Sequence, residues 1–261
     1  KLLQKVDRDN GRRVGWDELS AVTGQDAKKY APTGFARMNL LQAGIIGLGV
    51  GEQHIAAYAE HPSFEVCSIC DTDASKLAEV SRRRPGITAT GTPEEILQDS
   101  EVSVVSIASY DNFHAEQIIM ALKAGKHVFA EKPLCLFLEE AAEISAALRQ
   151  RPDLKLSSNL ILRCSPRFQD LKDRITAGQL GEVYAIEADY NYGRIEKLTN
   201  GWRGEIDYYS VMLGGGVHMV DLVRWLTGAE VEEVFATGNR VATAGSRFRH
   251  PDYVCTLLRL D

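Results

Sequence analysis

The sequence predicts an α/β protein: a Rossmann-type, doubly wound parallel sheet followed by an α+β domain with a mixed or antiparallel open sheet. Two observations predict the first part. From Leu40 onward, short apolar β-rich runs alternate with segments of helical spacing, and a glycine-rich stretch follows the first run. A third observation predicts the second part, because the late strand candidates follow one another with little helix between them.

The first part alternates strands and helices on short connections. Its strand candidates are LLQAGIIG, FEVCSIC, GITAT, VSVVSIA and KHVFA, separated by the helix candidates EQHIAAYAEH, ASKLAEVSRR, PEEILQD and FHAEQIIMALKA. Thr92 is placed as an N-cap ahead of Pro93, and Gly125 suits a C-terminal cap. This order implies right-handed crossovers and a parallel sheet covered on both faces.

The order changes after the helix candidate FLEEAAEISAALRQ. KLSSNLIL, the helix PRFQDLKDRITAGQLG, the strand EVYAIEADYNY and the helix VHMVDLVRWLTG lead into the strands EVEEVFATG and DYVCTLLRL. We divide the chain into a partial upstream segment (1–37), a Rossmann domain (38–152) and a substrate and dimerisation domain (153–261). Because the chain opens on Lys1 and stops at Asp261 straight after a strand, we expect it to be part of a longer protein.

Composition excludes several classes of protein. The 261 residues are 44% hydrophobic and 25% charged with a net charge of -6, which is typical of a globular protein and argues against a nucleic-acid binder. No apolar run approaches the roughly 20 residues of a membrane span. Five cysteines without a regular framework indicate a reducing compartment, the cytoplasm. Cys67 and Cys70 lie on a strand, where residues three apart face opposite ways, so we interpret both as structural.

The segment before Leu40 offers only a partial match to a calcium loop. Asp7, Asp9 and Glu18 fit such a loop, but Gly11 and Arg12 stand where a ligand and a glycine are required. Asn10-Gly11 is therefore interpreted as a hairpin turn. No metal site is predicted.

The stretch GIIGLGVGEQH, residues 44–54, has the parts of a dinucleotide-binding turn. Gly47 would make the turn after the strand, Gly49 would let a pyrophosphate approach, and Val50 and Gly51 lead into a helix whose amides face the anion. The usual third glycine would stand at Glu52, so the loop is one residue shorter. Asp71, 22 residues beyond Gly49, ends the second strand and is placed to bond a ribose diol, which favours NAD over NADP. An ordinary glycine-rich turn is the alternative.

Several separated motifs resemble one family, the Gfo/Idh/MocA oxidoreductases, over about residues 39–261. They are IIGLGVGEQH, the acid in ICDTD, NFHAEQIIMALKAGKHVFAEKP and LGGGVHMVDLVRWLTG. Members with a shortened G-x-G-x-G-x-x-H loop occur in this family, so the resemblance implies that the loop binds the cofactor. The stretch from Tyr192 to Asp221 also looks like members associated with surface-polysaccharide sugar metabolism.

The resemblance implies roles for individual residues. Lys132 of Glu131-Lys132-Pro133 would lie beside the nicotinamide and the reacting carbon, and His218 would exchange a proton with the substrate hydroxyl. Asp221 shares a helix face with His218 and could orient the ring or contact substrate. A surface lysine on a turn and a structural histidine are the alternatives. Where many relatives carry an aspartate, four residues before the histidine, this chain has Gly214.

Two further groups of residues are candidates for binding. Ser109, Asn112 and His114 resemble residues that flank the cofactor near the fourth strand, although Asn112 or His114 could equally cap the following helix. A second group mixes cations, aromatic rings and hydrogen-bond donors that suit a sugar with or without phosphate. Side chains that lie at an interface or in solvent are an equal alternative. The group comprises Arg163, Tyr192, Trp202 and Arg203.

The leading hypothesis is an NAD-dependent dehydrogenase that acts on a secondary hydroxyl of a sugar, cyclitol or nucleotide sugar. One alternative is a glycoside hydrolase of the same fold, in which bound NAD oxidises the sugar transiently. Another is a regulatory protein that binds NAD without turnover. An exposed strand edge at the end of the chain further predicts a homo-oligomer, either a dimer or a tetramer.

Overall fold

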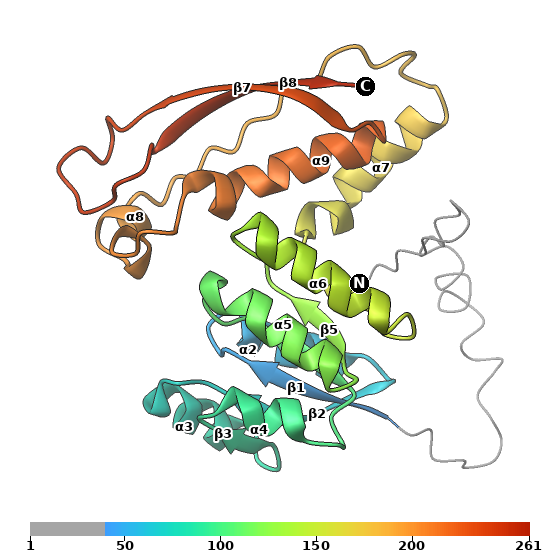
Figure 1. Cartoon of the computed structure of the whole chain (residues 1–261), viewed down its shortest axis with the longest axis vertical. Coiled ribbons are helices and arrows are strands. Elements are labelled where there is room, and N and C mark those ends of the chain that lie inside the picture. The colour runs from blue at the N-terminus through green and yellow to red at the C-terminus, as the bar shows by residue number, and fades with distance from the viewer. Residues whose placement is uncertain (1–39) are drawn as a thin grey trace. The chain divides into compact units, whose positions relative to one another are not determined.

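The structure is a computed structural model that describes residues 40–261, which form two compact units dividing between Asn159 and Leu160 (Figure 1). The hairpin expected at Asn10-Gly11 and the upstream segment 1–37 lie outside the described residues. Within 40–261, none of the helices has the length and apolar character needed to cross a membrane.

The first unit is built on a six-stranded sheet in which every neighbouring pair is parallel. Its strand order, β3-β2-β1-β4-β5-β6, is that of dinucleotide-binding folds and confirms the predicted doubly wound sheet. The last strand pairs with β5, although the sequence-based division placed it in the second domain. The strands are β1 (Leu41–Ile46), β2 (Phe64–Cys70), β3 (Thr88–Thr90), β4 (Val104–Ile107), β5 (His127–Ala130) and β6 (Leu156–Ser158).

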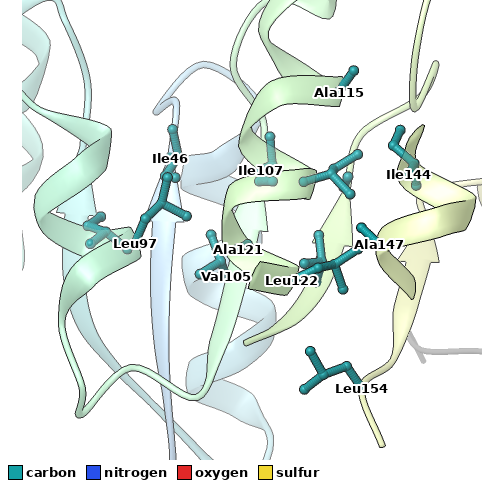
Figure 2. Packing of buried hydrophobic residues seen from close by; sticks show 14 of the residues in the cluster. Ile46, Leu97, Val105, Ile107, Ala115, Ala121, Leu122, Ile144, Ala147 and Leu154 are labelled. Carbon is teal, nitrogen blue, oxygen red and sulfur yellow. The ribbon is translucent and has the colours of Figure 1, made fainter. Parts of the chain in front are cut away.

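Helices cover both faces of this sheet because side chains alternate along each strand. Ile107 points to the face on which α4, α5 and α6 pack (Figure 2), whereas Ile45 points to the face packed by α2 and α3. Both residues are fully buried. The helices are α2 (Gly51–Glu60), α3 (Ala74–Arg83), α4 (Pro93–Gln98), α5 (His114–Lys123) and α6 (Leu138–Gln150).

Local signals at the helix ends are partly as expected. Gly125, just past α5, has a φ of +81°, the left-handed backbone that favours glycine at this position. Helix α4 begins at Pro93 with Thr92 as its N-cap residue, but the Thr92 side chain makes no capping hydrogen bond. The hydroxyl of Thr90 instead accepts a hydrogen bond from the amide of Thr92 at 3.0 Å.

The two cysteines of β2 do not face opposite ways, so that step of the sequence argument is wrong. The register between β1 and β2 shifts at Cys67, and both Cys67 and Cys70 pack against the same core cluster. Both are free thiols. Burial, with Asp71 nearby, raises the pKa of Cys70 to about 12, and burial also raises the pKa of Cys67. Thiols that stay protonated at neutral pH fit a structural role.

The second unit combines helices with a two-stranded antiparallel sheet. The expected strand at 182–192 does not form, because no strand within the described residues pairs with it. Five consecutive residues ahead of α9 form a π-helical turn, Met212–Gly216. The other elements are η2 (Ile161–Cys164), α7 (Pro166–Thr176), α8 (Glu196–Thr199), η3 (Trp202–Gly204), α9 (Val217–Thr227), β7 (Val231–Asn239) and β8 (Tyr253–Leu260).

Candidate active site

The candidate cofactor residues of the first unit follow the carboxyl ends of its strands. Because the strands are parallel, these ends meet at one edge of the sheet, where open α/β folds bind their ligands. Gly47 follows β1, Asp71 follows β2, Ser109 comes after β4, and Glu131 and Lys132 follow β5. Asn159, which the sequence did not single out, follows β6 at the same edge. The fold therefore gathers residues far apart in sequence at one edge.

The glycine loop is shaped by its close approach to the end of β4. Gly47 has a φ of +86°, and a Cβ there would lie 2.4 Å from the carbonyl oxygen of Ala108 and 2.6 Å from the amide nitrogen of Ser109. Gly49 is different, since a Cβ at this position would meet nothing within 4 Å. The backbone at Gly49 is thus open to a ligand, as a pyrophosphate requires.

Helix α2 begins at Gly51 directly after this loop. Its N-cap residue, Val50, makes no side-chain hydrogen bond to the amides of the first turn, so no side chain caps the helix there. A Cβ at Gly51 would lie 3.0 Å from the Ile45 side chain. The glycine therefore allows the helix to pack close to the sheet. An uncapped helix N-terminus beside an open backbone fits the phosphates of a dinucleotide.

Asp71 is bound to the glycine loop itself. Its Oδ2 accepts a hydrogen bond from the amide of Leu48 at 2.7 Å, and its Oδ1 accepts one from the amide of Asp73 at 2.9 Å. The ammonium of Lys76 lies 3.6 Å from Oδ2. The acid is therefore fixed beside the loop, with a cation that partly offsets its charge.

Glu131, next to Lys132, lies in a buried polar network. The Nε2 of His54 is 3.2 Å from Oε1 of Glu131, and the amide of Asn159 donates to the same oxygen at 2.6 Å. The Nδ1 of His54 is 2.9 Å from the hydroxyl of Ser106 on β4. Burial opposes ionisation, but the hydrogen bonds from His54 and Asn159 outweigh it and hold the pKa of Glu131 below its ordinary value.

His114 joins the loop after β4 to the loop after β5. Its ring is fully buried, with Nδ1 2.7 Å from the carbonyl oxygen of Pro133 and Nε2 3.0 Å from that of Ser109. The Ser109 hydroxyl donates to Gln117 at 2.7 Å. Asn112 is exposed, and the N-cap residue of α5 is Phe113, whose side chain makes no capping hydrogen bond. His114 is the first residue of α5, and both its ring nitrogens face backbone carbonyl oxygens.

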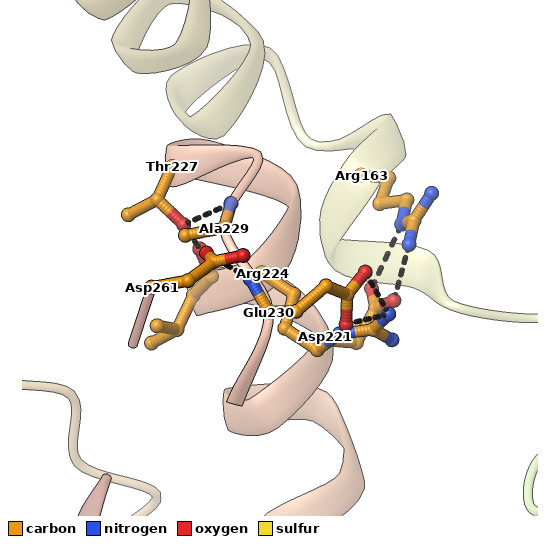
Figure 3. A network of polar contacts seen from close by, with 8 residues as sticks. Arg163, Asp221, Arg224, Thr227, Ala229, Glu230 and Asp261 are labelled. Carbon is orange, nitrogen blue, oxygen red and sulfur yellow. Dashed lines mark hydrogen bonds and ion pairs between the residues drawn. The ribbon is translucent and has the colours of Figure 1, made fainter. Parts of the chain in front are cut away.

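In the second unit, Asp221 is bound by Arg163. The guanidinium Nε of Arg163 donates to Oδ2 of Asp221 at 2.9 Å, and its Nη2 donates to Oδ1 (Figure 3). Both carboxylate oxygens are engaged, in the bidentate geometry that makes such pairs strong. The candidate substrate residue Arg163 and the candidate catalytic residue Asp221 thus neutralise one another and fix η2 against α9.

His218 lies one turn before Asp221 on α9 and is flanked by aromatic rings. The ring of Tyr190 stacks on His218 with centroids 6.0 Å apart, and Tyr192 stacks on Tyr190 at the same spacing. His218 is 6% exposed, whereas Tyr192 is 40% exposed. The candidate substrate residue Tyr192 is therefore connected to His218 through Tyr190.

Trp202 and Arg203 stack on each other rather than standing apart. The guanidinium of Arg203 lies 4.4 Å from the ring centroid of Trp202 and 5.4 Å from that of Tyr209. Tyr209 in turn fills the space at Gly214, because a Cβ there would lie 2.0 Å from the Tyr209 hydroxyl oxygen. A glycine at position 214 is thus required by the place of Tyr209.

Sequence reasoning missed several of these residues. His54 had a signal, since it stands three residues after Gly51 in the shortened loop motif. Asn159 and Ser106 had none, because only the strand order brings them to Glu131. Tyr190 and Tyr209 were missed because their contacts depend on glycines of the π-helical turn, Gly215 for the first and Gly214 for the second.

Comparison with known proteins places both units in one family. The profile described as the oxidoreductase family with an NAD-binding Rossmann fold matches residues 41–159, and that of the GFO/IDH/MocA C-terminal domain matches residues 168–261. The chain belongs to the Gfo/Idh/MocA oxidoreductases, as its motifs predicted. Its first unit is an NAD-binding Rossmann domain, and the open glycine loop and fixed Asp71 fit that cofactor.

Individual relatives are dehydrogenases of cyclitols and sugars. The chain is 29% identical over 206 residues to myo-inositol 2-dehydrogenase of Thermotoga maritima, covering 76% of this chain and 58% of that protein. It is 28% identical over 200 residues to D-glucoside 3-dehydrogenase of Escherichia coli, covering 72% and 54%. The chain therefore spans little more than half the length of these relatives.

A solved structure shares the fold. Scyllo-inositol dehydrogenase of Lactobacillus casei, crystallised with NAD(H) and scyllo-inositol, aligns with a TM-score of 0.74 at 23% identity. The alignment covers 85% of this chain and 66% of that one. At this identity the likeness concerns the fold.

A pair of glycine variants tests the loop geometry. Gly47→Ala should lower the free energy of unfolding by more than the roughly 1–3 kcal/mol of backbone strain, because its Cβ also meets the backbone of Ala108. Gly86→Ala is the matched control: Gly86 has a φ of +96°, but a Cβ there would meet nothing within 4 Å. Urea unfolding and NAD titration measure both. Equal losses in the two variants would contradict the close approach.

Proposed function

We propose that the whole protein is an NAD-dependent dehydrogenase that transfers hydride between the cofactor and a secondary hydroxyl of a sugar, cyclitol or nucleotide sugar. The observation that carries the proposal is the placement of Lys132 at the same edge of the sheet as the glycine loop and Asp71. The relatives named as inositol 2-dehydrogenase and D-glucoside 3-dehydrogenase support this class of substrate. The free thiols among the described residues support a cytoplasmic location.

The chemistry assigns a different task to each residue. When bound, NAD⁺ supplies the acceptor for the hydride that leaves the carbon. Lys132 orients the substrate oxygen, since an ammonium offers three donors to a hydroxyl or carbonyl. His218 takes the hydroxyl proton, because imidazole exchanges protons near neutral pH. Tyr190 holds the His218 ring by stacking, and Asp221 acts through its pair with Arg163.

The substrate residues follow the same proposal. Tyr192, Trp202 and Arg203 offer aromatic faces and a cation, which suit the apolar ring face and hydroxyl groups of a sugar. Trp202 and Arg203 already stack on one another, so they are presented as one preformed surface. Of the four candidates, Arg163 is committed to Asp221 and would contribute to substrate binding through that pair.

A substrate screen tests the activity. The protein is incubated with NAD⁺ and, separately, with myo-inositol, scyllo-inositol, methyl glucosides and nucleotide sugars, and NADH is followed by absorbance. Net NADH with at least one of them supports the proposal. Release of methanol from a glucoside without net NADH would replace it with the hydrolase. Thermal stabilisation by NAD with turnover of none would replace it with the regulatory protein.

Cofactor choice depends on Asp71 and Lys76. We expect NAD to bind at least about tenfold more tightly than NADP, because the Asp71 carboxylate accepts hydrogen bonds from a ribose diol and repels a 2′-phosphate. Asp71→Asn keeps an acceptor for the Leu48 amide and should narrow the difference, while Lys76→Ala removes the neighbouring cation and should widen it. Calorimetric titration of both cofactors decides; tighter NADP binding by the wild type would reverse the assignment.

The catalytic assignments predict a split between binding and turnover. Lys132→Ala and His218→Ala should each lower kcat by about 10²–10⁴ while the NAD dissociation constant stays nearly unchanged, since the glycine loop is intact in both. Lys123→Ala and His61→Ala are matched controls at exposed positions and should leave kcat unchanged. Near-normal kcat in either test variant would remove that residue from the mechanism.

Self-association is proposed through the outer face of the β7–β8 sheet. Phe235 and Leu257 are paired across the two strands and are 68% and 71% exposed, a contiguous apolar surface suited to a second copy of the chain. Phe235→Lys should shift the sedimentation coefficient toward the monomer. Val241→Lys, at an equally exposed apolar residue outside the strands, should not. A wild-type monomer at all concentrations would refute this interface.

A further inference from the structure

The buried network around Glu131 links the cofactor loop to Lys132. His54 belongs to α2, the helix that begins at the end of the glycine loop, and its ring reaches across to the loop after β5. The side chains of His54 and Glu131 are 5% and 14% exposed. Two segments that carry different parts of the proposed function are thus joined by one hydrogen bond in the interior.

The proton positions in this network follow from its acceptors. An ionised carboxylate only accepts hydrogen bonds, so the Nε2 of His54 donates to Glu131. In the neutral ring, Nδ1 then accepts from the Ser106 hydroxyl. Oε1 of Glu131 receives two hydrogen bonds, from His54 and Asn159, which fix the carboxylate in place. His54, Ser106, Glu131 and Asn159 thus each have a hydrogen-bond partner within the network, as burial requires.

The fixed charge acts on the residue that follows it. The hydrogen bonds from His54 and Asn159, together with the charge of Lys132, outweigh the burial of Glu131 and lower the pKa of its carboxyl group. The interaction is reciprocal, so the same carboxylate stabilises the Lys132 ammonium. His54 on α2 and Lys132 in the same loop are the charged or titratable groups that act on Glu131.

We propose that Glu131, held by His54 and Asn159, is the positioning residue of Lys132. The fixed carboxylate keeps the amine protonated and in place, and His54 ties that carboxylate to the helix carrying the glycine loop. On the other side of Lys132, His114 holds the Pro133 carbonyl. The assignment rests on the proposed function only for the catalytic importance of Lys132.

The test measures the reactivity of Lys132 directly and requires no substrate. The full chain, without cofactor, is labelled briefly with isotope-coded acetic anhydride across a pH series, and each lysine is quantified by peptide mass spectrometry. Only the free amine reacts. Glu131→Gln keeps the shape of the side chain and removes its charge, so Lys132 should react about three- to tenfold faster near pH 8. Lys123 and Lys155, both exposed, serve as internal controls.

The donors are tested by a double-mutant cycle. His54→Ala and Asn159→Ala should each accelerate labelling of Lys132 by less than Glu131→Gln does, and neither should add to the effect of Glu131→Gln. His54→Gln retains a donor and should restore nearly wild-type labelling. If His54→Ala does not fold, as judged by circular dichroism, Asn159→Ala alone completes the cycle, because Asn159 lies outside the helices and binds the same oxygen.

Two outcomes would overturn the assignment. Labelling of Lys132 at the wild-type rate in Glu131→Gln would show that the carboxylate does not act on the amine. Full additivity in the cycle would show that the two donors act by another route. Neither outcome depends on finding a substrate, so the substrate screen and the labelling experiment can fail independently of each other.

Discussion

The close approach of Gly47 to the end of β4 is the constraint on which the cofactor edge of the first unit depends. The Gly47 backbone lies so near the Ala108–Ser109 peptide that no side chain fits between them. From Ser109 the connection continues through the buried His114 ring to Pro133, beside Lys132. Contacts between loops that follow three different strands therefore fix the lysine relative to the glycine loop, and each depends on the parallel order of the sheet.

Buried polar groups make this edge costly to assemble and, once assembled, specific. Burying an unpaired charge or imidazole costs roughly several kcal/mol. His54, Glu131 and Asn159 are tolerated only because His54 and Asn159 both form hydrogen bonds with Glu131. Because the pKa of Glu131 is lower in the folded protein, the stability that this network contributes depends on pH. The stabilisation is fully present above the pKa that the carboxyl group has in the unfolded chain. It is lost as the pH falls through the lower pKa of the folded protein.

The sequence was sufficient for the elements whose signals are local. The alternation of strands and helices, the positive φ of Gly125 and the turn at Gly47 all follow from periodicity and from residue types. It was insufficient where partners are distant. The strand expected at 182–192 has a strand-like pattern but no partner within the described residues, and the register shift at Cys67 depends on how β1 and β2 pair.

The candidate site shows the same division between local and distant information. Lys132, Asp71 and His218 were located from motifs, but what holds each of them was not. Asp221 was expected to orient the His218 ring or to contact substrate, and the sequence did not indicate that both its oxygens accept hydrogen bonds from Arg163, 58 residues earlier in the chain. A motif identifies a residue type at a position, whereas the partner of a charged group is decided by tertiary packing.

Gly214 illustrates how tertiary packing decides which residue fits at a position. The Tyr209 hydroxyl lies where a Cβ at position 214 would begin, so a side chain there would displace the ring that reaches in from a neighbouring segment. Because Tyr209 also contacts Trp202 and Arg203, it couples the turn ahead of His218 to the proposed sugar-binding surface.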